Sequence, residues 1–275
     1  LDSLQKICLM HGIEVDYYKK LFQTARNIIE LIEKDDIPKY LLFLENVFPY
    51  MDNYNYQKGM KAIIQELKNF LKRKDIGTDS DRALLLDFQA TLEIKPEKAI
   101  KLEKDALAQI ENITADNARL VSNLHANLGG LYRMNGHPDL AREHMEKSIS
   151  LLDQFNLLHI NDSIPQIANY AMFLTEQQEP ERGISELQKL SGIIKEYHSD
   201  DCLDYAKVQE TLGTIYLMTA NLPQAKTHFK RAFKIYEKIW ADEPEMIEAK
   251  YQEIQELYPQ IGFCIGKNLS GLLTK

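Results

Sequence analysis

The sequence predicts an all-α protein built from stacked antiparallel helical hairpins, and three observations lead to that prediction. Helix breakers are few, with 12 glycines and 9 prolines among 275 residues. Apolar residues recur at intervals of three and four positions, which is the spacing of amphipathic helices. One long residue pattern occurs at residues 125–149 and returns at 209–233, and each copy has a turn signal between two amphipathic stretches. We therefore expect a series of two-helix units.

The repeated pattern places small residues where the two helices of a hairpin must approach closely. The two copies lie 84 residues apart, and Gly129 and Gly213 occupy the same position in them. A third copy at 167–191 lies halfway, with Ala171 at this position, so the period is 42 residues. The copy one period upstream is degenerate, because Asp87 stands at the small position. We expect four hairpins at this period.

In chain order, the copies and their flanks divide the chain into seven segments. Each hairpin turn carries a proline near the start of the second helix, where its missing N–H costs little. These prolines are Pro96, Pro138, Pro180 and Pro223. The expected segments are an N-terminal helical segment at 1–38, a degenerate hairpin at 39–79, four 42-residue hairpins at 80–121, 122–163, 164–205 and 206–247, and a C-terminal capping helix at 248–275. The capping helix would cover the apolar face of the last hairpin.

The copy at 206–247 carries the pattern L-G-x-x-Y followed by A-x-x-x-F-x-x-A, formed by Leu212, Gly213, Tyr216, Ala225, Phe229 and Ala232. This pattern resembles the tetratricopeptide repeat. The 42-residue spacing resembles the longer form of that repeat in kinesin light chains and in the C-terminal sensor arrays of bacterial signalling ATPases. The resemblance covers 80–247 well and 39–79 loosely. It implies a right-handed α-solenoid, a superhelix of stacked hairpins whose first helices line a concave face.

Composition and charge restrict the class of protein. The chain is 44% hydrophobic and 27% charged, which is typical of a soluble globular protein. No apolar run approaches the roughly 18 to 20 residues that span a bilayer. A formal net charge of −8 argues against a general nucleic-acid binder. The 3 cysteines have no C-x-x-C spacing, which indicates neither a disulfide framework nor a zinc site. We expect a cytoplasmic protein without membrane contact.

The sequence offers no catalytic constellation. The stretch GFCIGKN at 262–268 resembles a phosphate-binding loop, but it has too few residues between its glycines and lacks the Ser or Thr that should follow the lysine. His137, His144 and His228 have no cysteine or carboxylate at ligand spacing, so we interpret them as packing or surface residues. We expect no enzyme activity, no cofactor and no metal ion. The basic run KNFLKRKD at 68–75 is either a solvated face or a contact for an acidic partner.

Polar side chains mark the first helices of neighbouring hairpins on the side away from the packed residues. Asn127 and Asn169 lie 42 residues apart and therefore occupy identical repeat positions. An asparagine amide can donate and accept together, so a row of them can bond a peptide backbone. In tetratricopeptide proteins that bind peptides, asparagines at this place often do so, and the resemblance therefore implies a ligand groove. The expected peptide-binding residues of the concave face are Asn123, Asn127, Arg133, Asn169, Met172, Lys207 and Thr211. The alternative interpretation is a row of ordinary exposed polar residues.

These features predict a scaffold whose concave face recognises an extended peptide or a protein segment. The alternative is that the chain is the C-terminal sensor arm of a larger regulator, either a signalling ATPase or a peptide-responsive transcription regulator. The start at Leu1 without an initiator methionine favours that alternative. We expect a protein or peptide partner and no nucleic acid bound through this region. The sequence leaves open a covalently linked N-terminal domain and a homodimer.

Overall fold

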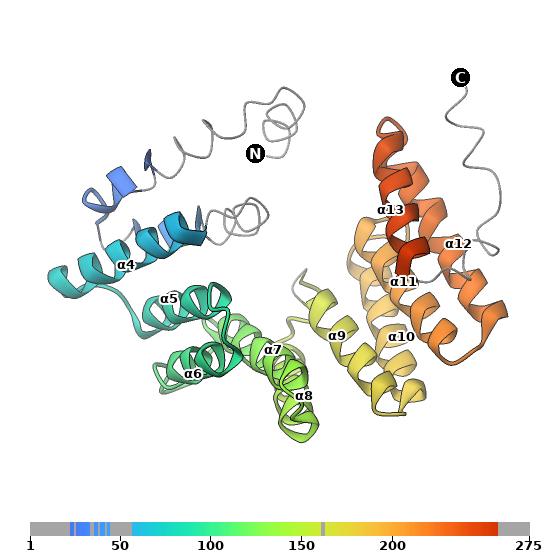
Figure 1. Cartoon of the computed structure of the whole chain (residues 1–275), viewed down its shortest axis with the longest axis horizontal. Coiled ribbons are helices and arrows are strands. Elements are labelled where there is room, and N and C mark those ends of the chain that lie inside the picture. Colours follow the sequence, from blue (N-terminus) through green and yellow to red (C-terminus); the bar gives the residue numbers. More distant parts are fainter. Residues whose placement is uncertain are drawn as a thin grey trace. The chain divides into compact units, whose positions relative to one another are not determined.

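The computed structural model shows a helical chain with no strand among the residues that it describes (Figure 1). These residues are 23–24, 26–33, 36–37, 39–41, 43–44, 57–160 and 163–257. Most of the expected N-terminal segment, part of the degenerate hairpin and the end of the capping helix lie outside them, as does the stretch at 262–268. Within the described part of the chain, no helix combines the length and the apolar character that crossing a membrane demands.

The long helices alternate along the chain as first and second helices of hairpins. They are α4 (Gln57–Lys74), α5 (Asp79–Thr91), α6 (Pro96–Leu107), α7 (Ala118–Met134), α8 (Pro138–Gln154), α9 (Ser163–Glu176), α10 (Pro180–Tyr197), α11 (Leu203–Met218), α12 (Leu222–Ile239) and α13 (Pro244–Leu257). Shorter helical stretches occur within 23–44. The four expected prolines all lie in the first turn of a second helix, which confirms their predicted role.

The chain divides into two compact units, residues 1–136 and 137–275. In the first unit, α4 packs on α5, α5 on α6 and α6 on α7. Its main apolar core joins α4 to α5 and to the helical stretches within 23–44. Leu67 and Phe70 of α4 and Phe88 of α5 are buried in this core. Burial of one face of each helix is therefore what holds these elements together.

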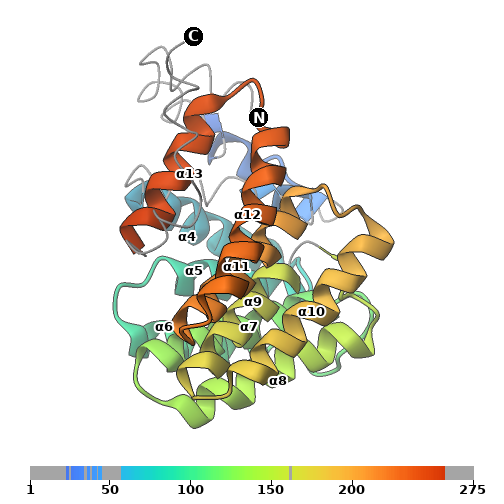
Figure 2. The same ribbon diagram turned by 90° about the vertical axis from the view of Figure 1, so that its right-hand side faces the viewer.

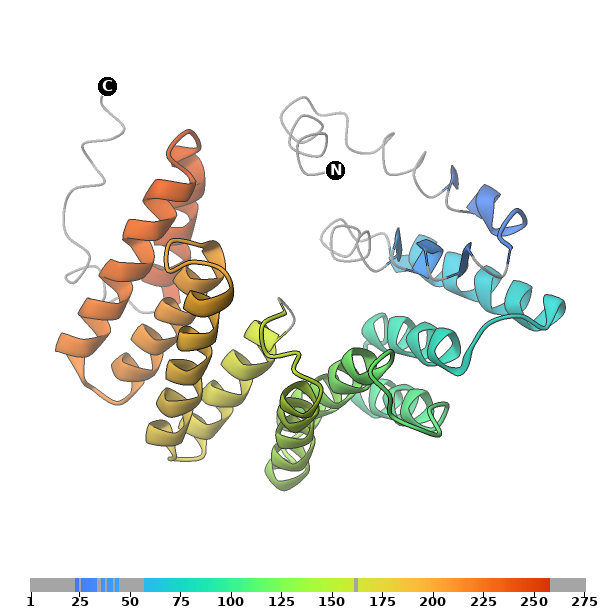
Figure 3. The same cartoon turned by 180° about the vertical axis from the view of Figure 1, so that it is seen from behind.

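In the second unit, α9 packs on α10, α10 on α11 and α11 on α12 (Figures 2 and 3). The helix α9 also contacts α11, so the first helices of two successive hairpins lie side by side. One continuous apolar core runs through these helices, with Ala171 on α9, Leu187 on α10, Leu212 on α11 and Phe229 on α12 among its buried residues. These residues belong to the pattern that the sequence repeats.

The last helix, α13, is attached to both helices of the hairpin before it. It packs on α12, and the Nζ atom of Lys250 lies 3.0 Å from the Oε1 atom of Glu210 on α11. The hydroxyl group of Tyr236 on α12 donates to the same carboxylate over 2.6 Å. Because Glu210 receives bonds from two helices, it links all three elements at this end of the second unit.

Glycine at the small positions of the pattern leaves no room for a larger side chain. A Cβ atom added to Gly213 would lie 2.9 Å from the ring of Phe229. A Cβ atom added to Gly183, at the small position of a second helix, would lie 2.6 Å from the backbone oxygen of Ala171. Both distances are well below ordinary van der Waals contact, and a packed interior has little space to relax. The repeated small residues thus set how closely the two helices approach.

The turns inside three of the four 42-residue hairpins contain a residue in the left-handed backbone region. Gly136 (φ 75°), Gln178 (φ 64°) and Ala220 (φ 58°) occupy this position at 42-residue intervals. After Ala220, the N–H group of Asn221 donates to the backbone oxygen of Tyr216 over 2.7 Å, which completes a Schellman motif at the end of α11. A Cβ atom costs about 1 to 2 kcal/mol in this backbone region. The geometry therefore favours glycine at all three positions.

Replacement of Ala220 by glycine is expected to raise the free energy of unfolding by about 0.5 kcal/mol, because the relief of backbone strain exceeds the entropic cost of glycine. Gly136→Ala is expected to lower it by a similar amount. Urea unfolding followed by circular dichroism measures both changes. The control is Ala249→Gly at an exposed position inside α13, which is expected to lower stability by about 1 kcal/mol. If Ala220→Gly and Ala249→Gly lowered the free energy of unfolding equally, the backbone at Ala220 would not be strained.

Candidate functional site

The predicted peptide-binding residues lie on three helices and fall in both compact units. Those of the first unit are on α7 and are Asn123, Asn127 and Arg133. Those of the second unit are Asn169 and Met172 on α9 and Lys207 and Thr211 on α11. Because α9 and α11 contact each other, the structure brings the residues of the second unit onto neighbouring helices.

The four predicted residues of the second unit differ in how far their side chains are already engaged. Asn169 is exposed, and none of the described residues hydrogen-bonds its amide. Met172 is half-buried and packs against the core. The Nζ atom of Lys207 lies 3.8 Å from Asp204 on its own helix, and its side chain is 55% exposed. The hydroxyl group of Thr211 donates to the backbone oxygen of Lys207 over 3.0 Å, so its proton is used inside the helix.

On α7, the amide of Asn127 is already engaged. Its Nδ2 atom donates to the Oδ1 atom of Asp87 on α5 over 2.8 Å. Asp87 lies in the hairpin before that of Asn127, so this bond joins two successive first helices. Asn169, at the identical repeat position, has no such partner among the described residues. Identical position in the repeat therefore does not give the two asparagines the same environment.

Glu103 of α6 completes this cluster from inside the hairpin. The residue is only 2% exposed. Burial, and then the charge of Asp87 and a hydrogen bond with it, raise the pKa of Glu103 to about 10, while a hydrogen bond with Asn127 acts in the opposite direction. At neutral pH, Glu103 therefore holds a proton beside Asp87. Its Oε2 atom has no hydrogen-bond partner among the described residues.

The repeat register explains where these two acids lie. Asp87 and Glu103 stand three 42-residue periods before Gly213 and Phe229, the pair in which a glycine lies against an aromatic ring. The first copy thus holds two carboxyl groups where the last copy holds an apolar contact. The sequence showed Asp87 as a departure from the pattern but gave no reason to select Glu103. Counting three periods back from Phe229 would have found it.

The raised pKa of Glu103 makes the stability of the first unit depend on pH. The folded chain keeps a proton that the unfolded chain releases above the ordinary carboxyl pKa of 4.5. The stabilising contribution is therefore complete below that pH and is lost as the pH rises toward about 10. Glu103→Gln retains the shape of the neutral acid but cannot ionise. We expect its urea midpoint to equal that of the parent near pH 4 and to exceed it near pH 8.

The matched control for this experiment is Glu111→Gln, at an exposed position in the loop after α6. It removes one carboxylate from the same unit without touching the cluster. Its midpoint is expected to follow that of the parent at both pH values. A Glu103→Gln midpoint that shifts equally near pH 4 and near pH 8 would show that Glu103 does not hold a proton in the fold.

His228 has a packing role, which is one of the two interpretations, packing or surface, that we drew from the sequence. Its Nδ1 atom lies 2.9 Å from the Oε1 atom of Gln209, to which it donates. Its ring stacks on Tyr216 with centroids 5.2 Å apart. Burial, and next the charge of Arg231, lower the pKa of His228. In the described part of the chain, no group of three or more His, Cys, Asp or Glu residues is placed to hold a metal ion.

Stacked helix pairs with small and large residues interlocking at 42-residue intervals define the class of tetratricopeptide-repeat scaffolds. Residues 163–238 match the family model described as tetratricopeptide repeat. This match confirms the tetratricopeptide resemblance of the sequence pattern over these residues. No curated protein sequence matches the chain.

Solved structures with a similar fold are themselves repeat proteins of this kind. A single-residue variant of a kinesin light chain candidate from Podosopora anserina, with nearly identical TPR-like repeats, has a TM-score of 0.59 and 13% identity over 76% of this chain and 99% of its own. BtubC (BKLC) from P. vanneervenii has a TM-score of 0.53 and 16% identity over 82% of this chain and 84% of its own. The chain therefore has a kinesin-light-chain-like tetratricopeptide fold, and the predicted α-solenoid class is confirmed.

Proposed function

We propose that the chain is a protein-interaction module that binds an extended peptide segment across α9 and α11, the first helices of two successive hairpins in the second unit. The observation that carries the proposal is the amide of Asn169, which is exposed and has no hydrogen-bond partner among the described residues. It stands on a first helix that contacts the next first helix. Such an amide can bond the C=O and N–H groups of a peptide backbone together.

Neighbouring residues on α9 and α11 provide an apolar surface and a positive charge for the bound peptide. Met172 presents an adaptable apolar surface that suits varied side chains. The Lys207–Asp204 pair is long, at 3.8 Å, and the lysine side chain is 55% exposed, so the ammonium group is available to a ligand carboxylate. Met218, at the end of α11, is 45% exposed and extends the apolar surface. A peptide with a carboxylate near one apolar side chain would satisfy these groups.

The predicted residues on α7 belong to the first unit, and we propose them there as peptide contacts in their own right. Asn123 and Arg133 are half-buried, and Asn127 is exposed. Because one N–H group of Asn127 already bonds Asp87, its amide is expected to contribute less than that of Asn169. The same recognition would serve a free-standing scaffold or the sensor arm of a larger regulator.

Replacement of Asn169 by alanine is expected to weaken peptide binding about tenfold, because two hydrogen bonds of about 0.7 kcal/mol each are lost. The measurement selects ligands for the parent chain from a diverse immobilised peptide library and then compares affinities by fluorescence anisotropy. Lys207→Glu is expected to weaken those peptides that carry a carboxylate. Asn127→Asp is expected to have a smaller effect than Asn169→Ala.

Gln188→Ala serves as the matched control, since Gln188 is an exposed amide on α10, the second helix of the same hairpin. It should bind peptides as the parent does. All variants should keep the helical circular dichroism of the parent. The proposal fails if no library peptide binds, or if the Asn169→Ala and Gln188→Ala chains bind alike.

A further inference from the structure

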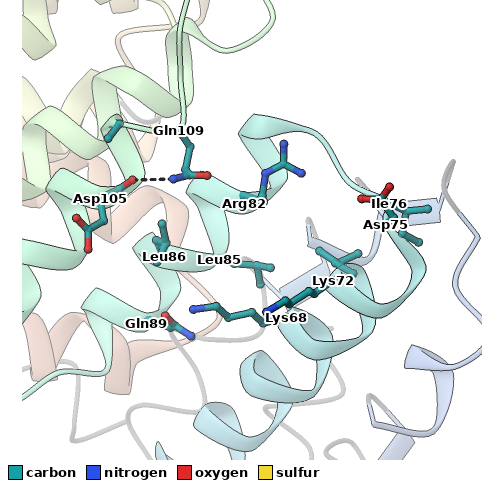
Figure 4. A pocket seen from close by; sticks show the side chains of 12 residues that line it. Lys68, Lys72, Asp75, Ile76, Arg82, Leu85, Leu86, Gln89, Asp105 and Gln109 are labelled. Atoms are coloured by element: carbon teal, nitrogen blue, oxygen red, sulfur yellow. Dashed lines mark hydrogen bonds between the residues drawn. The ribbon is translucent and has the colours of Figure 1, made fainter.

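We propose a second binding surface in the first unit, a groove that takes an acidic peptide segment carrying an apolar side chain. The groove lies between α4, α5 and the end of α6 and has a volume of about 730 Å³ (Figure 4). Leu71, Ile76, Leu85 and Leu86 form its apolar lining. The peptide-binding residues proposed above lie on α7, α9 and α11, so this groove is a separate surface.

Two lysines on α4 provide the positive charge at the edge of the groove. Lys68 and Lys72 lie one helical turn apart, both are exposed, and neither is ion-paired with a described residue. Arg73 on the same helix, in contrast, is paired with Glu30 at 2.7 Å. Residues one turn apart have Cβ atoms about 5 to 6 Å from each other. The two ammonium groups can therefore contact carboxylates of a single bound segment.

The other charged residues of the groove show how such a segment would lie. Arg82 is already paired with Asp79 on its own helix. Asp105 stands on α6 beside Gln109, on the far side of the groove from the lysines of α4 (Figure 4). Asp75 follows the last turn of α4. The α4 side of the groove is therefore cationic from Lys68 to Lys72 and becomes acidic only at Asp75. An acidic segment would run along this side, with its apolar side chain over Leu86.

An equivalent groove in the second unit has the opposite charge. It has a volume of about 860 Å³ between α8, α9 and α10, and Tyr170 lines it two 42-residue periods after Leu86. Its cations are already paired, with Lys189 lying 3.0 Å from Glu186 and Arg182 lying 3.4 Å from Glu146. The carboxylates that line it are Glu146, Asp153, Glu186 and Glu196. Charge therefore assigns the acidic partner to the first unit.

The net charge of the whole chain makes the groove of the first unit more selective as a site for an acidic segment. At −8, the net charge of the chain disfavours the approach of acidic segments. A pair of unpaired lysines over an apolar floor is then a local site of attraction, and it orients the partner as well as binding it. Apolar burial supplies affinity, while the carboxylates supply selectivity.

The test uses the full chain and an immobilised library of peptides in which one leucine or phenylalanine is flanked by glutamates. A matched library has glutamine in place of every glutamate. We expect the parent to retain members of the acidic library and to lose them as salt rises well above about 0.15 M. The double variant Lys68→Glu with Lys72→Glu should bind them at least about tenfold more weakly, because attraction becomes repulsion at two positions.

The control is Lys98→Glu with Lys101→Glu, which makes the same charge change at exposed positions of α6 that do not line the groove. It should bind acidic peptides as the parent does, and so should Asn169→Ala, which separates this inference from the proposed function. The inference is overturned if no acidic peptide binds, if glutamine peptides bind equally well, or if the control pair loses as much affinity as Lys68→Glu with Lys72→Glu.

Discussion

The close approach of two helices inside each hairpin is the constraint on which the rest of this structure depends. A side chain at Gly213 would meet the ring of Phe229, and one at Gly183 would meet the backbone of Ala171. With the helices held this close, the turn between them has to reverse the chain within a few residues. A left-handed residue such as Ala220 and a proline in the next helix achieve that reversal. The repeated small residues, the tight turns and the buried core all follow from the short distance between the two helices of a hairpin.

The first copy satisfies the same constraint with different chemistry. Where the last copy buries a ring against a glycine, the first buries Glu103 against Asp87, and Asn127 donates to the pair from the next hairpin. Burying an acid beside a second, half-buried one is costly unless one of them stays neutral and hydrogen bonds connect them. The position keeps its place in the fold, but an electrostatic contact replaces an apolar one. The repeat therefore specifies geometry more strictly than it specifies residue type.

The 42-residue period and the prolines at the start of second helices could be predicted, because each follows from local spacing or from a residue with a narrow structural use. The partner of Asn127 could not. Asp87 lies 40 positions away, and nothing local distinguishes Asn127 from Asn169. The groove beside Lys68 and Lys72 was equally out of reach, since the basic run identified the charge but not the apolar lining from α5. Sequence spacing reveals packing within a hairpin, whereas pairing between hairpins needs coordinates.

The bond from Asn127 to Asp87 also fixes the order of the hairpins. Arrays built from repeated units are often regarded as modules that can be exchanged or deleted, because each unit contacts only its neighbours. Here the hairpin with Asp87 and Glu103 relies on a donor that its successor must bring. If the hairpin that carries Asn127 were removed, Asn169 would take its place beside Asp87, and if the next hairpin were removed as well, Thr211 would do so. Only the asparagine could restore the amide donor, so the array tolerates some rearrangements and resists others.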